Sequence, residues 1–130
     1  MKGSMIFIGV SSVALGAFGA HVLKPMLSEK SMSIFQTASS YHLIYAVMLL
    51  ALYLYRQYTP NVWIKRAYYC ALIGIIFFSG SLYILATREL LGVAYLAPIL
   101  GPITPIGGVM MIGSWLLLWP AFTSVNAEDS

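Results

Sequence analysis

The stretch over residues 66–87, RAYYCALIGIIFFSGSLYILAT, carries no charged side chain after Arg66 until it ends. Its length suits one crossing of a bilayer as a helix. At about 100° per residue, its small and hydroxyl-bearing side chains fall on two separate stripes. One stripe holds Ala67, Cys70, Gly74 and Ser81, and the other holds Tyr68, Leu72, Ser79, Tyr83 and Ala86. Small residues allow helices to approach closely in membranes, so two stripes predict a central helix with neighbours on both sides.

The composition of the whole chain favours the membrane class. Of its 130 residues, 60% are hydrophobic and 8% are charged, with a mean hydropathy of +0.85. Soluble domains contain about 25% charged residues. The formal charge of +3 leaves too few basic side chains for a nucleic-acid surface, so no nucleic-acid partner is expected. Cys70 is the only cysteine, which excludes an internal disulfide.

Four apolar stretches are long enough to span a membrane. We expect an all-α membrane protein, a single integral membrane domain over residues 1–130 whose four transmembrane helices form a compact bundle. The spans cover roughly residues 4–23, 39–58, 66–87 and 104–122. Between the first two spans, Pro25 ends a helix, and Ser28 or Ser31 can cap the next one.

The connection between the third and fourth helices, residues 88–106, is apolar but rich in proline and glycine. Its helix-breaking residues are Gly92, Pro98, Gly101, Pro102 and Pro105. Because proline removes a helical hydrogen bond, the pattern predicts that this segment is not one regular helix. We expect it to lie along the membrane interface or to fold partly back into the bundle.

The first apolar stretch admits a second interpretation. Lys2, the apolar run and the sequence AFGA at residues 17–20 resemble a secretory signal peptide with its cleavage site. We favour a retained helix, since the chain contains the segment. Small residues on this helix fall within an arc of about 100° and predict a packing stripe against a neighbouring helix. The stripe consists of Gly9, Ser12, Gly16, Gly19 and Ala20.

Four motifs follow one another along the chain: GAFGAH at residues 16–21, FQTASSYH at 35–42, FSGSLY at 78–83 and GPITPIGG at 101–108. Together they resemble, over nearly the whole chain, the small four-span bacterial membrane proteins of the domain of unknown function 423 family, also called UPF0382. The resemblance implies an inner-membrane location and a four-helix topology. It supplies no activity, substrate or catalytic residue.

Polar side chains on the second and third spans predict a candidate polar pocket. On the second span, His42, Tyr45 and Tyr53 share one face, while other side chains point elsewhere, namely Leu43, Val47, Leu50 and Leu54. The pocket would be lined by His42, Tyr45, Tyr53, Ser79, Ser81 and Tyr83, with Thr104 from the following segment. The alternative, which we favour, is that the hydroxyls bond to backbone carbonyls or across helices.

His21 closes the first predicted helix and His42 opens the second, so we expect both near one membrane surface. Imidazoles are common metal and haem ligands, which makes the pair a candidate metal site. Because no carboxylate or thiol accompanies them in the sequence, we favour two interfacial histidines bonded to backbone, headgroups or water. We therefore expect no metal and no cofactor.

All four carboxylates fall in predicted loops or in the tail: Glu29, Glu89, Glu128 and Asp129. A proton-coupled transporter carries its proton on an acid within the membrane, and paired carboxylates serve acid–base catalysis. The sequence also shows no nucleophile triad, phosphate loop or zinc-ligand spacing. These absences argue against a proton-coupled exporter and predict that the protein is not an enzyme.

The many small-residue stripes favour a structural or accessory membrane protein, which packs against another membrane protein or against copies of itself. The alternative is a binder or conduit for a small neutral or lipid-like molecule, such as a lipid or a quinone, between the second and third helices. In both interpretations, membrane lipids surround the protein as partners.

The number of spans also bears on orientation, because four spans place both termini on one side of the membrane. The amino end and the second loop carry Lys2, Arg56, Lys65 and Arg66, against Lys24, Lys30 and Arg88 in the other loops. This excess favours cytoplasmic termini in a bacterial inner membrane.

Overall fold

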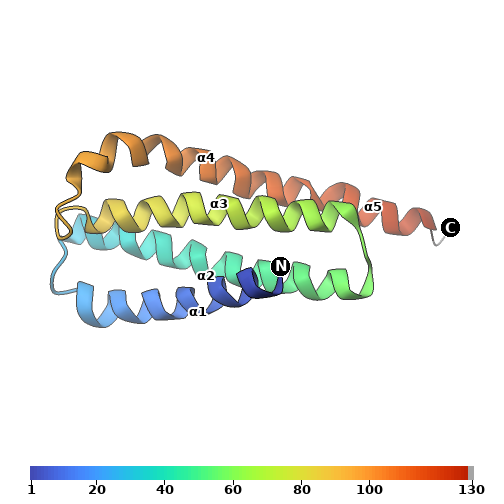
Figure 1. Cartoon of the computed structure of the whole chain (residues 1–130), viewed down its shortest axis with the longest axis horizontal. Coiled ribbons are helices and arrows are strands. Elements are labelled where there is room, and N and C mark those ends of the chain that lie inside the picture. Colours follow the sequence, from blue (N-terminus) through green and yellow to red (C-terminus); the bar gives the residue numbers. More distant parts are fainter. Residues whose placement is uncertain (129–130) are drawn as a thin grey trace.

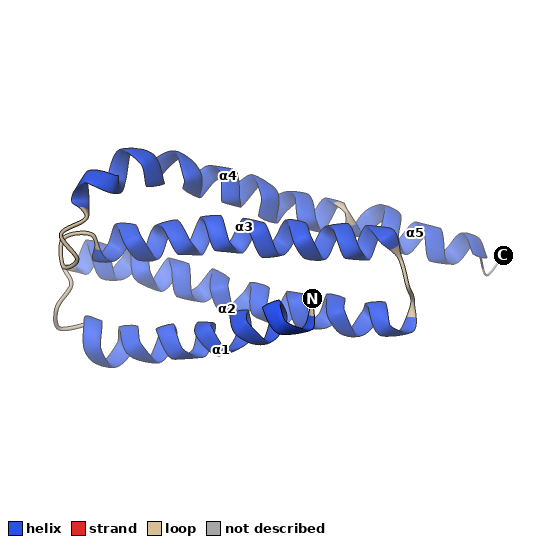
Figure 2. Cartoon of the chain, viewed as in Figure 1, coloured by secondary structure: helices blue, strands red, loops and turns tan. Residues whose placement is uncertain are grey.

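The computed structural model describes the backbone of residues 1–128 and the side chains of residues 1–123. The described residues form helices and no strand (Figure 2). The helices are α1 (Lys2–Phe18), the π-helical turn η1 (Gly19–Leu23), α2 (Glu29–Tyr58), α3 (Val62–Thr87), the 3-10 turn η2 (Ala94–Leu96), α4 (Ala97–Leu116) and α5 (Leu118–Glu128). Four segments are long and apolar enough to cross a membrane: Lys2–Leu23, Glu29–Tyr58, Val62–Thr87 and Ala94–Thr123. The prediction of an all-α protein with four spans is confirmed.

The second helix begins directly after Ser28, one of its two predicted caps, and therefore extends beyond the predicted span over residues 39–58. Ser28 is its N-cap, and the Ser28 hydroxyl accepts a hydrogen bond from the Ser31 amide at 3.2 Å. No proline or glycine follows before the apolar span, so residues 29–38 join the helix instead of forming a loop. Hydropathy locates the apolar part of a helix and not its ends, which explains the difference. Asn61 caps α3 in the same way, accepting from the Trp63 amide at 2.7 Å.

The helices pack in chain order, with α3 between α2 and α4 (Figure 1). The first stripe of α3 faces α4, where the hydroxyls of Ser81 and Thr104 lie 2.6 Å apart. The second stripe faces α2, where the Ser79 hydroxyl donates to the Ala38 carbonyl at 2.8 Å. Thus α3 is the central helix, whereas α1 contacts mainly α2.

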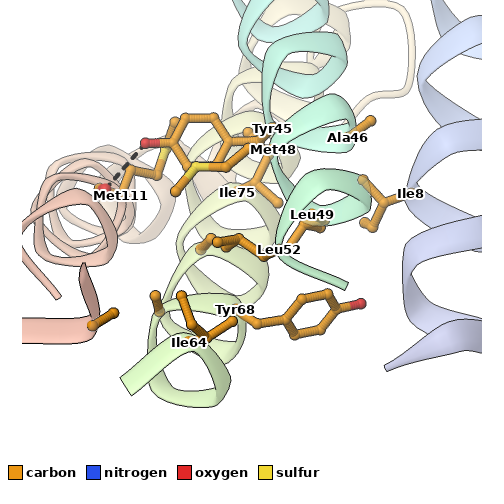
Figure 3. Packing of buried hydrophobic residues seen from close by; sticks show 13 residues of the cluster. Ile8, Tyr45, Ala46, Met48, Leu49, Leu52, Ile64, Tyr68, Ile75 and Met111 are labelled. Atoms are coloured by element: carbon orange, nitrogen blue, oxygen red, sulfur yellow. Dashed lines mark hydrogen bonds between the residues drawn. The ribbon is translucent and has the colours of Figure 1, made fainter. Parts of the chain in front are cut away.

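The largest buried cluster lies where α2 and α3 meet (Figure 3). Leu49 from α2 and Ile64, Ala67 and Tyr68 from α3 have no exposed surface. The Tyr68 hydroxyl reaches the start of the chain and donates to the Met1 carbonyl at 2.7 Å. Because lipid tails are as apolar as these side chains, close packing and hydrogen bonds stabilise the contact more than removal from water does.

The small-residue stripe of α1 and η1 packs against α2 at three of its five positions. Ser12 and Gly19 are buried, and a side chain at Gly19 would collide with the ring of Phe35. A Cβ at Gly16 would lie 3.4 Å from the Ser39 hydroxyl oxygen. The two remaining positions are open or exposed, namely Gly9 and Ala20.

The fourth helix begins earlier in the sequence than the predicted span over residues 104–122. From Ala97 the chain is α-helical, and this helix includes Pro102 and Pro105, so the expectation that these prolines break the segment is wrong. Membrane helices tolerate proline because neighbouring helices and hydroxyl side chains compensate the disturbed backbone. Here the Thr104 hydroxyl donates to the Leu100 carbonyl at 3.2 Å.

The irregular part of the connection is confined to the residues between α3 and η2. It consists of turns over residues 88–93 and contains Gly92, whose φ is +67°. This backbone conformation favours glycine because it has no Cβ. The chain therefore reverses direction there and returns as the fourth span.

Helices α3 and α4 approach each other closely at Gly74 and Gly107. A Cβ at Gly74 would lie 2.9 Å from the Met111 amide nitrogen, and one at Gly107 would lie 2.8 Å from the Gly74 carbonyl oxygen. Both distances are shorter than a carbon atom tolerates, so a larger residue would push the backbones apart. In contrast, a Cβ at Gly108 would lie 3.7 Å from the Phe78 ring, an ordinary contact.

Replacing Gly107 by alanine therefore tests the contact between α3 and α4. We expect Gly107→Ala to lower the free energy of unfolding by about 1–3 kcal/mol, as overpacking does in a close-packed interior. The matched control, Gly108→Ala, should leave it unchanged or raise it by up to about 1 kcal/mol, because alanine favours a helix over glycine and the added Cβ makes an ordinary contact. The measurement is reversible unfolding in detergent micelles, and equal stability of both variants would contradict the close contact.

Candidate functional site

His42 lies well inside α2, not at its end. The helix begins at Glu29, so at about 1.5 Å per residue His42 lies about 20 Å along the helix axis. Its side chain is buried, with 6% of its surface exposed. The expectation that His42 opens the second helix is therefore wrong, because the helix starts before its apolar part.

Two hydroxyls from neighbouring helices contact the His42 ring. Nδ1 lies 3.1 Å from the Tyr83 hydroxyl of α3, and Nε2 lies 3.3 Å from the Ser11 hydroxyl of α1. Ser11 Oγ lies closer, at 2.7 Å, to the Phe7 carbonyl, which takes its one hydrogen. The Ser11 oxygen therefore accepts from Nε2–H, and the Tyr83 hydroxyl donates to Nδ1. The His42 ring, in one tautomer, thus joins three helices.

A hollow of about 210 Å³ lies beside this cluster, between α1 and α3. Figure 1 shows these two helices on either side of α2, which forms the floor. Polar groups of Ser11, His42, Ser79 and Tyr83 border the hollow, together with Gly80, around whose Cα there is open space. The other walls are apolar: Phe7, Ile8, Leu15, Ile75 and Ile76.

A second hollow, of about 380 Å³, shares Leu15 and Tyr83 with the first and continues to the turns at the end of the molecule. We call the two hollows together the α1–α3 groove. Its outer walls include Phe18 and Leu91, whose side chains are exposed, so the groove faces the surrounding lipid. Val22 of the π-helical turn η1 also lines it, and such turns are frequent at functional sites. Among the residues that line the groove, none is charged.

The seven residues of the predicted polar pocket do not share one cavity. His42, Ser79 and Tyr83 border the α1–α3 groove. Ser81 and Thr104 bond to each other between α3 and α4, and Tyr53 packs against the main cluster. The remaining residue is Tyr45. The hollow is thus walled by α1 as well as α3, instead of lying only between the second and third helices.

Tyr45 connects α2 to α4. Its hydroxyl donates to the Met111 carbonyl at 3.0 Å (Figure 3). The Trp115 indole N–H donates in turn to the Tyr45 oxygen at 3.1 Å. Both bonding partners come from α4, so Tyr45 stabilises the packing of that helix and does not contribute to the groove.

His21 is separated from His42. It is exposed in η1, and Ser11, which contacts His42, lies about 15 Å away from it along the first span. In the part of the chain that the structure describes, no three side chains of histidine, cysteine, aspartate or glutamate come together. The side chain of Glu128 and all of Asp129 lie outside that part. The arrangement of His21 and His42 therefore gives no support to a shared metal ion.

The sequence analysis did not identify Ser11, which contacts His42, or Leu15 and Gly80, which line the smaller hollow. Ser11 lies one position before Ser12, outside the small-residue stripe, and points toward the groove instead of the α2 contact. A single serine in an apolar helix is too common a pattern to indicate a site. Only the pairing of α1 with α2 reveals that it meets His42.

Removing the Tyr83 hydroxyl tests the hydrogen bonds of His42. In Tyr83→Phe, Nδ1 loses its donor and remains buried, so we expect the free energy of unfolding to fall by about 1–3 kcal/mol. The control is Tyr95→Phe, because Tyr95 is exposed in η2; we expect a change below about 0.5 kcal/mol. Thermal unfolding in detergent measures both. An unchanged Tyr83→Phe protein would show that this bond does not stabilise the fold.

Comparison with known proteins identifies the family. The family model DUF423, described as a protein of unknown function, matches residues 15–108. A UPF0382 membrane protein of Staphylococcus epidermidis is 43% identical over 107 residues, which cover 82% of this chain and 81% of the relative. The membrane protein YwdK of Bacillus subtilis is 35% identical over 108 residues, covering 82% of each chain.

One relative with lower sequence identity is named as an inner membrane protein. The UPF0382 inner membrane protein YgdD of Escherichia coli K12 is 34% identical over 117 residues, which cover 88% of this chain and 84% of the relative. No solved structure matches the chain. The motifs GAFGAH and FSGSLY lie within the matched residues, as the resemblance implied. The chain therefore belongs to the DUF423 (UPF0382) family of membrane proteins, whose function is unknown.

Proposed function

We propose that the protein binds a lipid-like molecule in the α1–α3 groove, with the polar head of that molecule beside His42. The observation that carries the proposal is a hydrogen-bonded imidazole at the border of an apolar hollow, far from either end of α2. Ionisable side chains inside a membrane are rare and usually functional. Because the groove faces lipid, a molecule can reach it sideways from the bilayer.

The size of the groove suits a hydrocarbon chain. Small-molecule pockets are mostly apolar, measure about 300–1,000 Å³ and contain few polar groups. The hollow of about 380 Å³ falls in that range, and the hollow of about 210 Å³ adds the polar end. A partner helix is about 10–12 Å across and would need far more room. The groove therefore accommodates a chain better than a protein segment.

The hydrogen bonds around His42 favour a particular head. Both donors, the Tyr83 hydroxyl and Nε2–H, are used inside the cluster, and the Tyr83 oxygen also has a hydrogen bond to the Ser39 side chain, so the free acceptor position is a lone pair on the Ser11 oxygen. A charged head would meet no opposite charge among the residues that line the groove. A neutral head that donates a hydrogen bond, such as the hydroxyl of a diglyceride or a quinol, satisfies both conditions.

The accessory role that the sequence favours has weaker support. It was inferred from small-residue stripes, and the glycines at positions 16, 19, 74 and 107 pack within the chain. Gly9 and Ala20 are left for a second copy or another membrane protein. We also propose binding instead of catalysis, because no carboxylate or thiol lines the groove beside His42.

Filling the groove tests the proposed function. The protein is purified from its own membrane in a mild detergent, and neutral lipids extracted from it are identified and quantified per chain. We expect one class of neutral amphipathic lipid to be retained, and Gly80→Leu to reduce its amount by about tenfold, since a leucine side chain occupies the smaller hollow. The control is Gly101→Leu, which introduces the same side chain into open space on α4.

Two results would contradict this proposal. In the first, the wild-type protein carries no neutral lipid above the level found with an unrelated membrane protein. In the second, Gly80→Leu folds and retains as much lipid as Gly101→Leu does. Native mass determined in the same preparations also tests the accessory role, because a defined partner chain would then co-purify.

We propose that the protein resides in a bacterial inner membrane with cytoplasmic termini. The excess of basic residues at the end that carries the termini supports this orientation, and the name of the relative YgdD supports the location. Fluorescent protein fused to the carboxyl end should fluoresce, whereas alkaline phosphatase fused there should be inactive. The opposite pair of results would reverse the orientation.

A further inference from the structure

Arg56 lies at the opposite end of the molecule from the turns that close the α1–α3 groove. It is in the last turn of α2, two positions before the helix ends at Tyr58, and its side chain is partly buried. One terminal nitrogen, Nη1, donates to the Met1 sulfur at 3.2 Å. The Nε atom is buried and has no hydrogen-bond partner. A thioether is a weak acceptor, so the guanidinium group is poorly satisfied by the protein.

Among the side chains that the structure describes, no carboxylate lies near this cation. Glu29, at the start of α2, and Glu89, after α3, are the carboxylates whose side chains the structure describes, and both lie at the other end. Lys65 and Arg66, in the first turn of α3, lie at the same end as Arg56 and add positive charge. The carboxyl end of α2 attracts a cation through its dipole, but this does not give Nε an acceptor.

Aromatic side chains place Arg56 at the level of lipid headgroups. Tyr58 and Trp119 at this end are 87% and 78% exposed. Trp63 lies at the same end, at the start of α3, and the Arg66 guanidinium stacks over its ring at 4.8 Å. Tryptophan, tyrosine and basic residues gather where a membrane helix meets the headgroups. Phosphate groups of the lipids are therefore expected acceptors at this end of the molecule.

We propose that Arg56 binds the phosphate group of an anionic phospholipid through the terminal nitrogens of its guanidinium group, since the buried Nε cannot be reached from outside the protein. Arginine suits this role because its planar fork of N–H donors matches two phosphate oxygens at once. The positive charge of Lys65 and Arg66 favours a lipid with net negative charge over a zwitterionic one. This site does not involve the α1–α3 groove, so a test of one proposal does not decide the other.

Lipid binding to purified protein in an uncharged detergent tests the site. The probes are phosphatidylglycerol, phosphatidylcholine and inorganic phosphate, and bound lipid is counted by native mass spectrometry. We expect phosphatidylglycerol to bind in preference to phosphatidylcholine, and Arg56→Gln to weaken its binding about tenfold, the loss of one charge-assisted hydrogen-bonded contact. Millimolar inorganic phosphate should not displace the lipid.

The control is Lys65→Gln, which removes one exposed positive charge at the same end. We expect it to weaken binding less than about twofold, because exposed charges contribute little. If Arg56→Gln fails to fold, Arg56→Lys takes its place and should still bind less tightly, since lysine lacks the fork. Equal loss in the Arg56 and Lys65 variants, no preference for phosphatidylglycerol, or displacement by inorganic phosphate would each overturn the proposal.

Discussion

The close approach of α3 and α4 at Gly74 and Gly107 determines where the other helices pack. It occupies one face of α3 along its length, and the opposite face is occupied by α2. No comparable face of α3 remains for α1, which therefore packs mainly on α2. The α1–α3 groove is the space that this order leaves beside the shared helix. The candidate site is thus a consequence of helix packing and not of a local motif.

Polar side chains have different roles on the two sides of α3. Toward α4, the hydroxyls of Ser81 and Thr104 satisfy each other, and Tyr45 bonds to a backbone carbonyl. Toward α1, His42 and Tyr83 form a cluster that borders an open hollow. In a membrane, unsatisfied polar groups are costly, so most of them close on protein partners. The cluster at His42 also closes on protein partners, but it borders a hollow that another molecule can fill.

Much of the fold follows from the sequence, because apolar length and small-residue spacing are local properties. The two stripes of residues 66–87 predict a central helix, and the four spans follow from hydropathy. The ends of the helices were predicted only in part: Ser28 is one of two predicted caps of α2, whereas Pro102 and Pro105 lie inside α4 instead of breaking it. The site required knowledge of which helices are neighbours. The depth of His42 depends on where α2 begins, and its bond to Ser11 depends on α1 lying beside α2.

The single-sided packing of α1 has a consequence for motion. The other three spans share extensive contacts through α3, whereas α1 is held by α2 and by side-chain bonds from Ser11 and Ser4 to His42 and Tyr68. Local opening requires least free energy where the fewest contacts break. The first span is therefore the element that can swing outward while the remainder keeps its shape. Such a movement would widen the α1–α3 groove and leave the packing of α3 against α2 and α4 unchanged.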